Sequence, residues 1–420
     1  MKVVIMAGGK GTRIAGMYAD IPKPMIPVAG RPVLEHQLMV LRDQGFRDII
    51  LSVGHLGHVV QNHFRDGAAF GVHITYVEEQ TPLGTAGALF HLKDVLTEDF
   101  MLVNGDLIFD VDITRFATFH RDNGGFATIF THPNDHPFDS GIIFTDAAHR
   151  VTRWLHREDK RGWYHNRVNA GLHMLSPKLL EFPVFLAERK VDLDRDLLRP
   201  LIESGNLIAY NSPEYVKDMG TPERCREVET DILSGCVVGK NLSKKQKAVF
   251  LDRDGTINEY VGLLTDISDM RLLEGSAEAI REINKSGYLA IVATNQPVIA
   301  RGDVTFEELD EIHAKMETLL GEQGAYIDAI YHCPHHPDKG FTGEVPELKI
   351  ECNCRKPKPG LLLQAARDFN IDLESSWMVG DSERDVLAGE QAGCRTIFLQ
   401  GSLLDAVRQM DLSGETGRAE

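Results

Sequence analysis

The sequence has no long apolar run, few cysteines and no surplus of positive charge. No stretch approaches the roughly 18 apolar residues of a membrane-spanning helix, and the short apolar N-terminus leads directly into glycines, unlike a secretion signal. The formal net charge of −17 argues against nucleic acid as a partner, because that partner requires a basic face. The six cysteines cluster, which favours a metal in a reducing compartment over a disulfide framework. We therefore expect a cytoplasmic protein with no membrane or nucleic-acid partner.

The chain of 420 residues is too long for one ordinary hydrophobic core, and two of its segments begin alike. An apolar strand at Val3–Met6 precedes AGGKGTR, and another at Ala248–Leu251 precedes DRDGT. Each pattern is typical of the first strand of a parallel α/β domain, where ligands bind at the carboxyl ends of the strands. The polar residues 239–247 separate the two segments as a linker. We predict an α/β protein of two Rossmann-like three-layer domains, residues 1–238 and 248–420.

Short apolar runs bounded by turn residues predict strands, and amphipathic stretches between them predict helices. The expected strands are 48–53, 74–77, 100–104, 126–131, 289–294, 329–332, 376–379 and 395–399, and the expected helices include 33–44, 276–286 and 306–321. This alternation indicates βαβ units in both halves.

Paired carboxylates follow the first strand of the second half. VFLDRDGTINEY places Asp252 and Asp254 two residues apart, so both side chains point the same way and can share Mg²⁺ or divide nucleophilic and acid–base work. A plain D-x-D-G turn or a calcium loop would also explain this motif on its own.

Three more polar motifs follow strands or turns of the second half. VATNQ offers Thr294 and Asn295 to a phosphate, RKPKPG offers the cation Lys356, and MVGDSERD offers Asp381 and Asp385 to a metal ion. The four motifs together supply what phosphoryl transfer needs, so we expect phosphate chemistry here.

DRDGT, TNQ, CRKPKPG and GDSERD resemble the four motifs of the haloacid dehalogenase superfamily of phosphatases. The resemblance implies that Asp252 attacks phosphorus and forms an aspartyl-phosphate, while Asp254 protonates the leaving alkoxide and then activates water. It implies that Thr294 and Lys356 hold the phosphoryl group. Mg²⁺ would be bound by Asp252, the backbone carbonyl of Asp254, and Asp381.

A cysteine–histidine cluster precedes the third of these motifs. Its members are spaced C-x-H, sixteen residues, then C-x-C, and they are Cys333, His335, Cys352 and Cys354. Thiolate and imidazole ligands at this spacing suit tetrahedral Zn²⁺, although three buried cysteines and a surface histidine are the alternative. Three thiolates and one imidazole leave no open position, so we expect a structural zinc that positions Lys356 and the substrate-binding Arg355.

Residues 247 to about 399 are most similar to the heptose bisphosphate phosphatases, which are related to histidinol-phosphate phosphatases. The histidinol enzymes carry a shorter loop between the zinc pairs, so the long gap here favours a heptose substrate. Pro297 and Val298 depart from the Ser-Gly that heptose phosphatases often have in a loop that faces the substrate.

Glycines follow the first strand of the chain in AGGKGTR. Their lack of side chains would let backbone N–H groups face a triphosphate, with positive charge added nearby; the glycines are Gly8, Gly9 and Gly11, and the cations are Lys10, Arg13 and Lys23. The spacing is neither that of a P-loop nor that of a dinucleotide site, and a bare glycine turn is the alternative. Asp106 in LVNGD and Asp218 in VKDMGTPE add two carboxylates that suit Mg²⁺ bound with a nucleoside triphosphate.

AGGKGTR, PKPM, LGTAGA, NGD and NAGLH together resemble the sugar-1-phosphate nucleotidyltransferase family over about 225 residues. The resemblance implies in-line attack of a sugar 1-phosphate oxygen on the α-phosphorus, with pyrophosphate leaving. The residues it implies are Arg13 and Lys23 for phosphates, Asp106 and Asp218 for Mg²⁺, Gln80 and Gly84 for the base, and Gly141, Asn169 and Gly171 for the sugar. GMYADIPKPMIPVAGRPVLEH is most similar to heptose and mannose 1-phosphate guanylyltransferases. LHREDKRG departs from the E-K-P of many relatives, so the basic residue that contacts the sugar phosphate stays open.

The two resemblances predict consecutive steps of GDP-heptose synthesis, with GTP or another nucleoside triphosphate and heptose phosphates as the partners. Mg²⁺ would serve both domains, and Zn²⁺ the second. The alternative within enzymes is a hexose 1-phosphate nucleotidyltransferase fused to a histidinol-type phosphatase, and the alternative of another class has one half inert as a sensing or scaffolding domain. The oligomeric state stays open, with a homodimer as one option.

Overall fold

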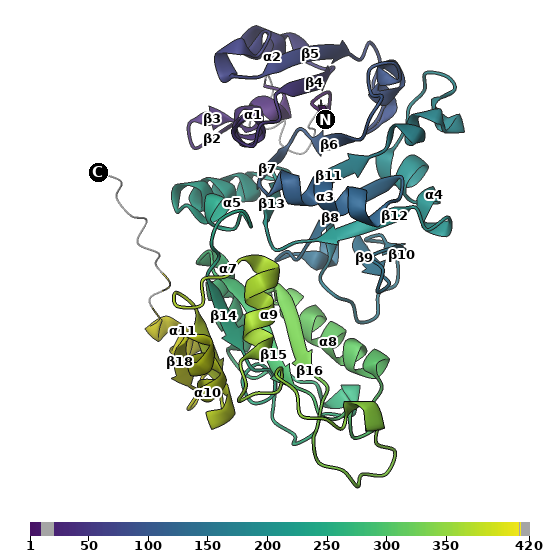
Figure 1. Cartoon of the computed structure of the whole chain (residues 1–420). Helices are drawn as coiled ribbons and strands as arrows, with labels where there is room; N and C mark the ends of the chain where they lie inside the picture. The colour runs from purple at the N-terminus through teal and green to yellow at the C-terminus, as the bar shows by residue number, and fades with distance from the viewer. Residues whose placement is uncertain (10–20, 411, 413–420) are drawn as a thin grey trace. The chain divides into compact units, whose positions relative to one another are not determined.

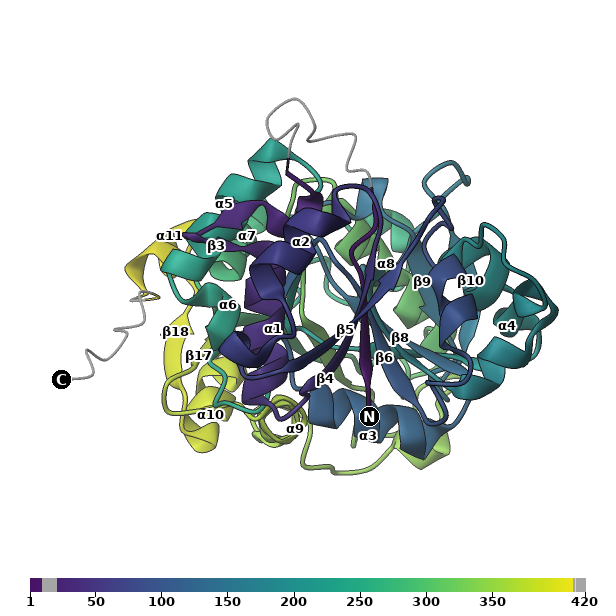
Figure 2. The ribbon, with the colours of Figure 1, turned by 90° about the horizontal axis from the view of Figure 1, so that it is seen from above.

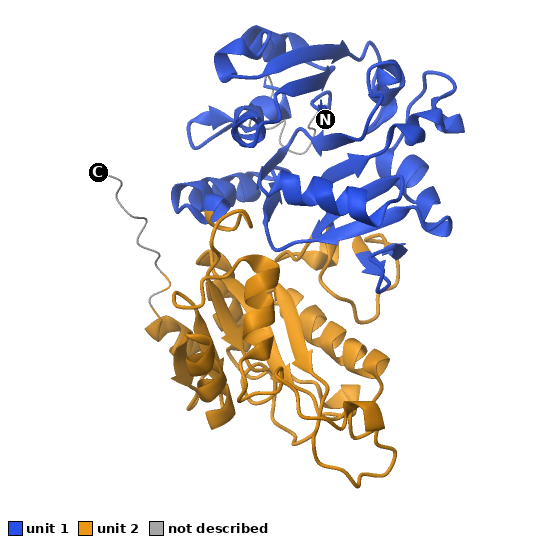
Figure 3. Ribbon diagram, viewed as in Figure 1, with its two compact units in different colours: residues 1–131, 143–154, 169–238 blue, residues 132–142, 155–168, 239–420 orange. Residues whose placement is uncertain are grey.

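The computed structural model describes residues 1–9, 21–410 and 412, and these form two compact units (Figure 3). Unit 1 comprises residues 1–131, 143–154 and 169–238, and unit 2 comprises residues 132–142, 155–168 and 239–420. The two short segments 132–142 and 155–168 therefore cluster with the second unit, although they lie within the first predicted range. In the described part of the chain, no helix has the length and apolar character needed to cross a membrane.

Unit 1 is built on a mixed sheet with a parallel centre. Its strands, in spatial order, are β10 (Val151–Leu155), β9 (Ile142–Thr145), β11 (Val168–Leu175), β6 (Phe100–Asn104), β1 (Val3–Met6), β4 (Asp48–Val53) and β5 (His73–Glu78). Off this path, β8 (Ala127–His132) pairs with β11 and with β12 (Leu207–Asn211). Strands β1, β4, β5 and β6 are parallel, whereas β11 runs antiparallel to β6 and β9. Two small antiparallel pairs join β7 (Leu107–Asp110) to β13 (Tyr215–Asp218) and β2 (Pro27–Val28) to β3 (Arg31–Pro32).

Helices cover the sheet of unit 1 because its strands bury both faces. Val3 and Ile5 of β1 belong to one hydrophobic core, and Val4 between them belongs to the other, as the two-residue period of a strand requires. Helix α1 (Val33–Asp43) lies beside β4 in Figure 2 and presents Leu34 and Leu38, four residues apart, to the first of these cores. The other α-helices of this half are α2 (Gly57–Phe64), α3 (Ile113–Asn123), α4 (Pro200–Glu203), α5 (Pro222–Leu233) and α6 (Cys236–Gly239).

Unit 2 is a five-stranded parallel sheet (Figure 1). Its spatial order is β16 (Ala329–Cys333), β15 (Leu289–Asn295), β14 (Ala248–Leu251), β17 (Trp377–Gly380) and β18 (Arg395–Phe398). The helices between and after these strands are α7 (Ser276–Lys285), α8 (Phe306–Gly321), α9 (Gly360–Phe369), α10 (Glu383–Ala392) and α11 (Leu403–Gln409). Successive residues of β14 alternate between two cores, so the sheet is the middle of three layers.

The predicted α/β fold class is confirmed in both units. Helix α8 has the predicted ends, and each predicted strand is present with its ends shifted by at most two residues. The polar segment 239–247 is an integral part of unit 2, since Gln246 is 1% exposed and its backbone exchanges hydrogen bonds with Asn370 and Asp372. A polar composition suggested a solvated linker, but these long-range backbone bonds give the segment a folded position.

Both sheets reverse their winding at the first strand of the unit. Strand β1 lies between β4 and β6, and β14 lies between β15 and β17. In open α/β sheets, ligands bind beyond the carboxyl ends of the strands at such a switch point. The residues that follow these strands include Gly8 and Asp106 in unit 1, and Asp252 and Asp381 in unit 2.

Candidate active sites and metal centre

Three carboxylates converge at the switch point of unit 2. One oxygen from each of Asp252, Asp381 and Asp385 lies within 4.8 Å of the others. Lys356 Nζ lies 2.9 Å from Asp252 Oδ1 and 2.6 Å from Asp385 Oδ1. Burial raises the pKa of Asp252, an effect that Lys356 opposes, and burial together with Asp385 raises the pKa of Asp381. One lysine cannot neutralise three carboxylates, so the cluster keeps a net negative charge when the acids are ionised. The carboxylate oxygens are suitable ligands for a hard divalent cation such as Mg²⁺.

Gly255 allows the loop after β14 to approach this cluster. Its φ is +79°, and a Cβ at this position would lie 2.0 Å from Asp381 Oδ2. Only glycine therefore lets the D-x-D-G turn pack against the acid that follows β17.

Two predicted site residues hold Lys356 and α10 in place. Asn295 Nδ2 donates to Lys356 O at 3.0 Å, and Lys356 N donates to Asn295 Oδ1 at 2.9 Å. Asp385 Oδ2 accepts from Ser382 N at 3.0 Å and from Ser382 Oγ at 2.9 Å, which caps α10. Asn295 was expected to bind substrate, and the structure commits its amide group to the backbone that carries the lysine.

Asp254 is held by residues to which the sequence reasoning assigned no role. Its carboxylate accepts hydrogen bonds from Arg253, Asn258 and Gln296, with donor–acceptor distances between 2.9 and 3.2 Å. Although burial raises the pKa of Asp254, these partners, led by Arg253, hold it below its usual range. Arg253 belongs to the DRDGT motif and Gln296 to the TNQ motif. A cation and an amide so close to the ends of buried strands could have indicated partners for Asp254.

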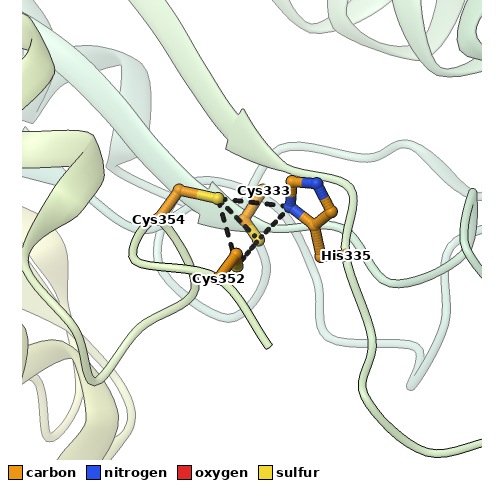
Figure 4. A group of neighbouring side chains, drawn as sticks. All are labelled: Cys333, His335, Cys352 and Cys354. Atoms are coloured by element: carbon orange, nitrogen blue, oxygen red, sulfur yellow. Dashed lines mark hydrogen bonds between the residues drawn. The ribbon is translucent and has the colours of Figure 1, made fainter. Parts of the chain in front are cut away.

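The predicted zinc ligands point toward one another from the two ends of their loop (Figure 4). The three sulfur–sulfur distances among Cys333, Cys352 and Cys354 are between 3.2 and 3.5 Å, and His335 Nδ1 lies 3.3 Å from Cys354 Sγ and 3.6 Å from Cys333 Sγ. A hydrogen bond from Cys333 is the main cause that lowers the pKa of Cys354. Three sulfurs and one nitrogen in this compact group fit a tetrahedral zinc ion.

The zinc loop is also joined to the basic residue that follows it. Arg355 Nη1 donates to His335 O at 3.2 Å. Arg355 is adjacent to both Cys354 and Lys356 in the chain, so the cluster and the cation of the carboxylate site share one short segment.

In unit 1, the structure brings Lys23 and Asp106 together. Lys23 Nζ lies 2.7 Å from Asp106 Oδ2, just past the end of β6. Gln37 of α1 supports this turn, because its Nε2 donates to Asn104 O at 3.0 Å and to Leu107 O at 2.8 Å. The predicted acid is thus fixed beside a predicted phosphate-binding cation.

Asp218 lies on the strand next to this turn. It ends β13, and the following residue, Met219, donates its N–H to Asp106 O at 2.8 Å. The carboxylate itself pairs with Arg224 Nη1 at 2.6 Å. A backbone hydrogen bond therefore holds the segments of Asp106 and Asp218 next to each other, while each carboxylate pairs with a different cation.

The remaining predicted residues of the first site are dispersed. Gly8 and Gly9 follow β1 after one intervening residue, and Gln80 is exposed after β5. Gly84 packs on its own chain, since a Cβ there would lie 2.4 Å from Val191 O. Asn169 and Gly171 share β11, where Asn169 Oδ1 accepts from Gly171 N at 3.2 Å, whereas Gly141 belongs to unit 2. Lys10, Gly11 and Arg13 lie outside the described residues.

Comparisons with known proteins match the two halves of the chain to different families. Residues 2–235 match the nucleotidyl transferase family, and residues 353–406 match the HAD-hydrolase-like family. A D-glycero-beta-D-manno-heptose-1,7-bisphosphate 7-phosphatase of Pasteurella multocida is 42% identical over 155 residues, which are 37% of this chain and 81% of that protein. A mannose-1-phosphate guanyltransferase of Saccharomyces cerevisiae is 32% identical over 253 residues, which are 59% of this chain and 67% of that protein.

A solved structure shares the fold of more than half of the chain. A Bacillus anthracis protein, described as a candidate glucose-1-phosphate thymidylyltransferase and crystallised with sucrose, superposes with a TM-score of 0.50 at 20% identity. The match covers 55% of this chain and 94% of that chain. At this identity, the likeness speaks for the fold alone.

Proposed function

Because the chain belongs to the nucleotidyl transferase family in its first part and to the heptose-bisphosphate phosphatase family in its second, we propose that this enzyme catalyses two consecutive steps of GDP-heptose synthesis. It removes the 7-phosphate of heptose 1,7-bisphosphate, and it then transfers GMP from GTP to heptose 1-phosphate. The observation that carries the proposal is chemical: the reaction in the name of the phosphatase relatives leaves a sugar 1-phosphate, the substrate class of the guanyltransferase relative. We assign the transferase to residues 1–238 and the phosphatase to residues 248–420.

In the phosphatase, Asp252 acts as the nucleophile. Its carboxylate oxygen attacks phosphorus, and the bond from phosphorus to the C7 oxygen breaks. That oxygen takes a proton from Asp254, which must therefore enter this step in its protonated form. Asp254 then takes a proton from water, whose oxygen attacks the aspartyl-phosphate and releases inorganic phosphate. Lys356 and Thr294 hold the phosphoryl oxygens through both steps. Asp252, the backbone carbonyl of Asp254, and Asp381 would bind Mg²⁺, which offsets the charge of the transferring group.

We assign Arg355 to the binding of the sugar substrate. Its guanidinium is tied to the zinc loop through His335 O, and it is offered to the sugar phosphate. Zinc bound by the four Cys and His ligands would have a structural task, because that ligand set leaves no open position.

In the transferase, an oxygen of heptose 1-phosphate attacks the α-phosphorus of GTP. The bond between the α-phosphorus and the bridging oxygen breaks, and pyrophosphate leaves. Lys23 and Arg13 bind phosphate oxygens at the N–H groups of Gly8, Gly9 and Gly11. Asp106 and Asp218 would bind Mg²⁺, with Gln80 and Gly84 near the base and Asn169 and Gly171 near the sugar.

The test uses the full chain with Mg²⁺ and each substrate in turn. Both anomers of heptose 1,7-bisphosphate are assayed for phosphate release, and the product is incubated with GTP, ATP, CTP, UTP and dTTP for pyrophosphate release. We expect phosphate from the bisphosphate and pyrophosphate from GTP alone. Release of phosphate from histidinol phosphate but not from heptose bisphosphate would refute the phosphatase assignment, and preference for another nucleotide would refute the guanylyl assignment.

A further inference from the structure

In the sequence, Arg253 stands between the proposed nucleophile Asp252 and the proposed acid Asp254, and its side chain is fully buried. Its guanidinium contacts three side chains: Asp254 through Nε and Nη2, Gln296 Oε1 through Nη2 at 3.0 Å, and His313 Nε2 through Nη1 at 3.2 Å. A guanidinium has donors only, so each of these partners must accept.

This one-way chemistry determines the state of His313. Its Nε2 must offer a lone pair to Arg253, so the ring is neutral and carries its proton on Nδ1. Burial and the neighbouring Arg253 also place the pKa of His313 well below its usual range. Helix α8 thus presents an uncharged acceptor beneath the guanidinium.

The same chemistry determines the orientation of Gln296. Because Gln296 Oε1 accepts from Arg253, the amide nitrogen must point the other way. Its two hydrogens are donated to Asp254 Oδ2 and to Thr294 Oγ1, each at 2.9 Å. Thr294 Oγ1 is therefore an acceptor toward Gln296, and its own O–H hydrogen is left for another oxygen.

We propose that Arg253 and Gln296 are positioning residues of the phosphatase. Because Arg253 can only donate, it fixes the Gln296 side-chain oxygen as an acceptor. The Gln296 amide nitrogen must then donate to Asp254 and to Thr294. One result is a fixed Asp254 carboxylate, grasped by Arg253 on both oxygens, and the other is a Thr294 hydroxyl that donates to the phosphoryl group. The inference rests on the proposed phosphatase chemistry but not on the identity of the sugar.

The first test is Gln296→Glu, which keeps the shape of the side chain but replaces both N–H donors with an acceptor. We expect kcat for an alkyl phosphate ester such as heptose 1,7-bisphosphate to fall about 100-fold, with KM changed less than about threefold. The matched control is Gln364→Glu, because Gln364 is exposed on α9 in the same unit.

The second readout uses p-nitrophenyl phosphate, whose leaving group departs without a proton. Phosphorylation of Asp252 should then stay comparatively fast in Gln296→Glu, while hydrolysis of the aspartyl-phosphate, which needs Asp254 as a base, becomes slow. We expect a burst of about one p-nitrophenolate per active site in the variant and no burst in the parent chain. A purely structural loss of active enzyme would lower both steps together and give no burst.

Arg253→Lys supplies a second variant, because lysine keeps the charge but replaces the planar fork with one nitrogen. We expect its kcat to fall at least as far as that of Gln296→Glu. Zinc content and melting temperature verify that each variant is folded. A folded Gln296→Glu chain with kcat within threefold of the parent, or a loss without a burst, would overturn the proposal. If the parent chain ignores heptose bisphosphate yet the variants show the burst with p-nitrophenyl phosphate, the positioning roles stand and only the proposed substrate is refuted.

Discussion

At the residue scale, Lys356 is the buried cation that pairs with two of the three clustered carboxylates of unit 2. It is 2% exposed, and its ammonium group lies between Asp252 and Asp385. A buried ion pair of this kind contributes less than its Coulomb energy suggests, because both charges lose water. Removal of one partner is costly, because it leaves the other charge buried without compensation.

We predict that Lys356→Met abolishes phosphate release and destabilises unit 2 by about 3–5 kcal/mol, because two buried carboxylates then face each other. Urea unfolding followed by tryptophan fluorescence measures the loss. Mg²⁺ should restore part of the lost stability, since it replaces the missing positive charge at the acids. Lys358→Met is the control, as Lys358 is exposed two residues further on. Equal unfolding free energies for the two variants would contradict the prediction.

At the scale of the element, helix α8 supplies a neutral histidine to one contact and two carboxylates to another. His313 faces Arg253, whereas Asp310 and Glu317 both pair with His165. Burial lowers the pKa of His165, but the carboxylates of Glu317 and Asp310 outweigh this effect and raise it to about 9. His165 is therefore a cation near neutral pH, held within unit 2 by one face of the helix.

We predict that the stability contributed by His165 depends on pH. The folded pKa of about 9 exceeds the unfolded value of about 6.5, so the contribution is full below pH 6.5 and is lost as pH rises through 9. The difference in unfolding free energy between the parent chain and His165→Gln should be at most about 3 kcal/mol at pH 6 and should shrink by pH 10. A difference that stays constant between pH 6 and 10 would show that His165 acts only through packing.

The zinc loop is the second element whose role can be tested. Between β16 and α9 the described chain holds only a 3-10 turn, Pro346–Leu348, so a metal ion joining its ends would replace missing secondary structure. Arg355 and Lys356 follow the last ligand directly.

We predict that zinc removal by a chelator, or Cys352→Ser, lowers phosphate release at least tenfold and leaves pyrophosphate release within twofold. Metal analysis and both assays on the same sample measure this. The control is Cys394→Ser, because Cys394 lies outside the cluster and should leave zinc content unchanged. Equal loss of both activities in the zinc-free chain would contradict a role confined to the phosphatase.

At the scale of the whole molecule, each unit has its own sheet, its own cores and its own switch point. The carboxylate sets at the two switch points share no residue. We therefore expect the two activities to be independent in their chemistry, even though one chain holds both.

We predict that Asp252→Asn lowers phosphate release at least about 1000-fold and spares pyrophosphate release, because it removes only the nucleophile of unit 2. Asp106→Asn should do the reverse. Both variants are measured in both assays, and a mixture of the two should restore the full sequence of reactions. Loss of both activities from one substitution would show that the sites are coupled.

Sequence alone predicted the groups that are close together along the chain or that follow recognisable strands. Four consecutive residues contain Asp252, Asp254 and Gly255. The C-x-H and C-x-C spacings of the cysteine–histidine cluster can be read directly from the sequence. The parallel winding then implied that distant strand ends meet at one edge of a sheet, which is why Asp381 was expected near Asp252. Period and spacing are local properties, so they can be read from one chain.

Tertiary structure decided the contacts that no local pattern encodes. Arg253 meets Gln296 and His313 across 43 and 60 residues, and the direction of its donors gives Gln296 and Thr294 their orientation. The same holds for Asn295 on the Lys356 backbone and for the segment 155–168, which clusters with the second unit although its sequence belongs to the first family. The sequence determined which chemical groups are present at each strand end; packing across long separations determined which of them touch, because burial obliges every donor to find an acceptor wherever the chain has placed one.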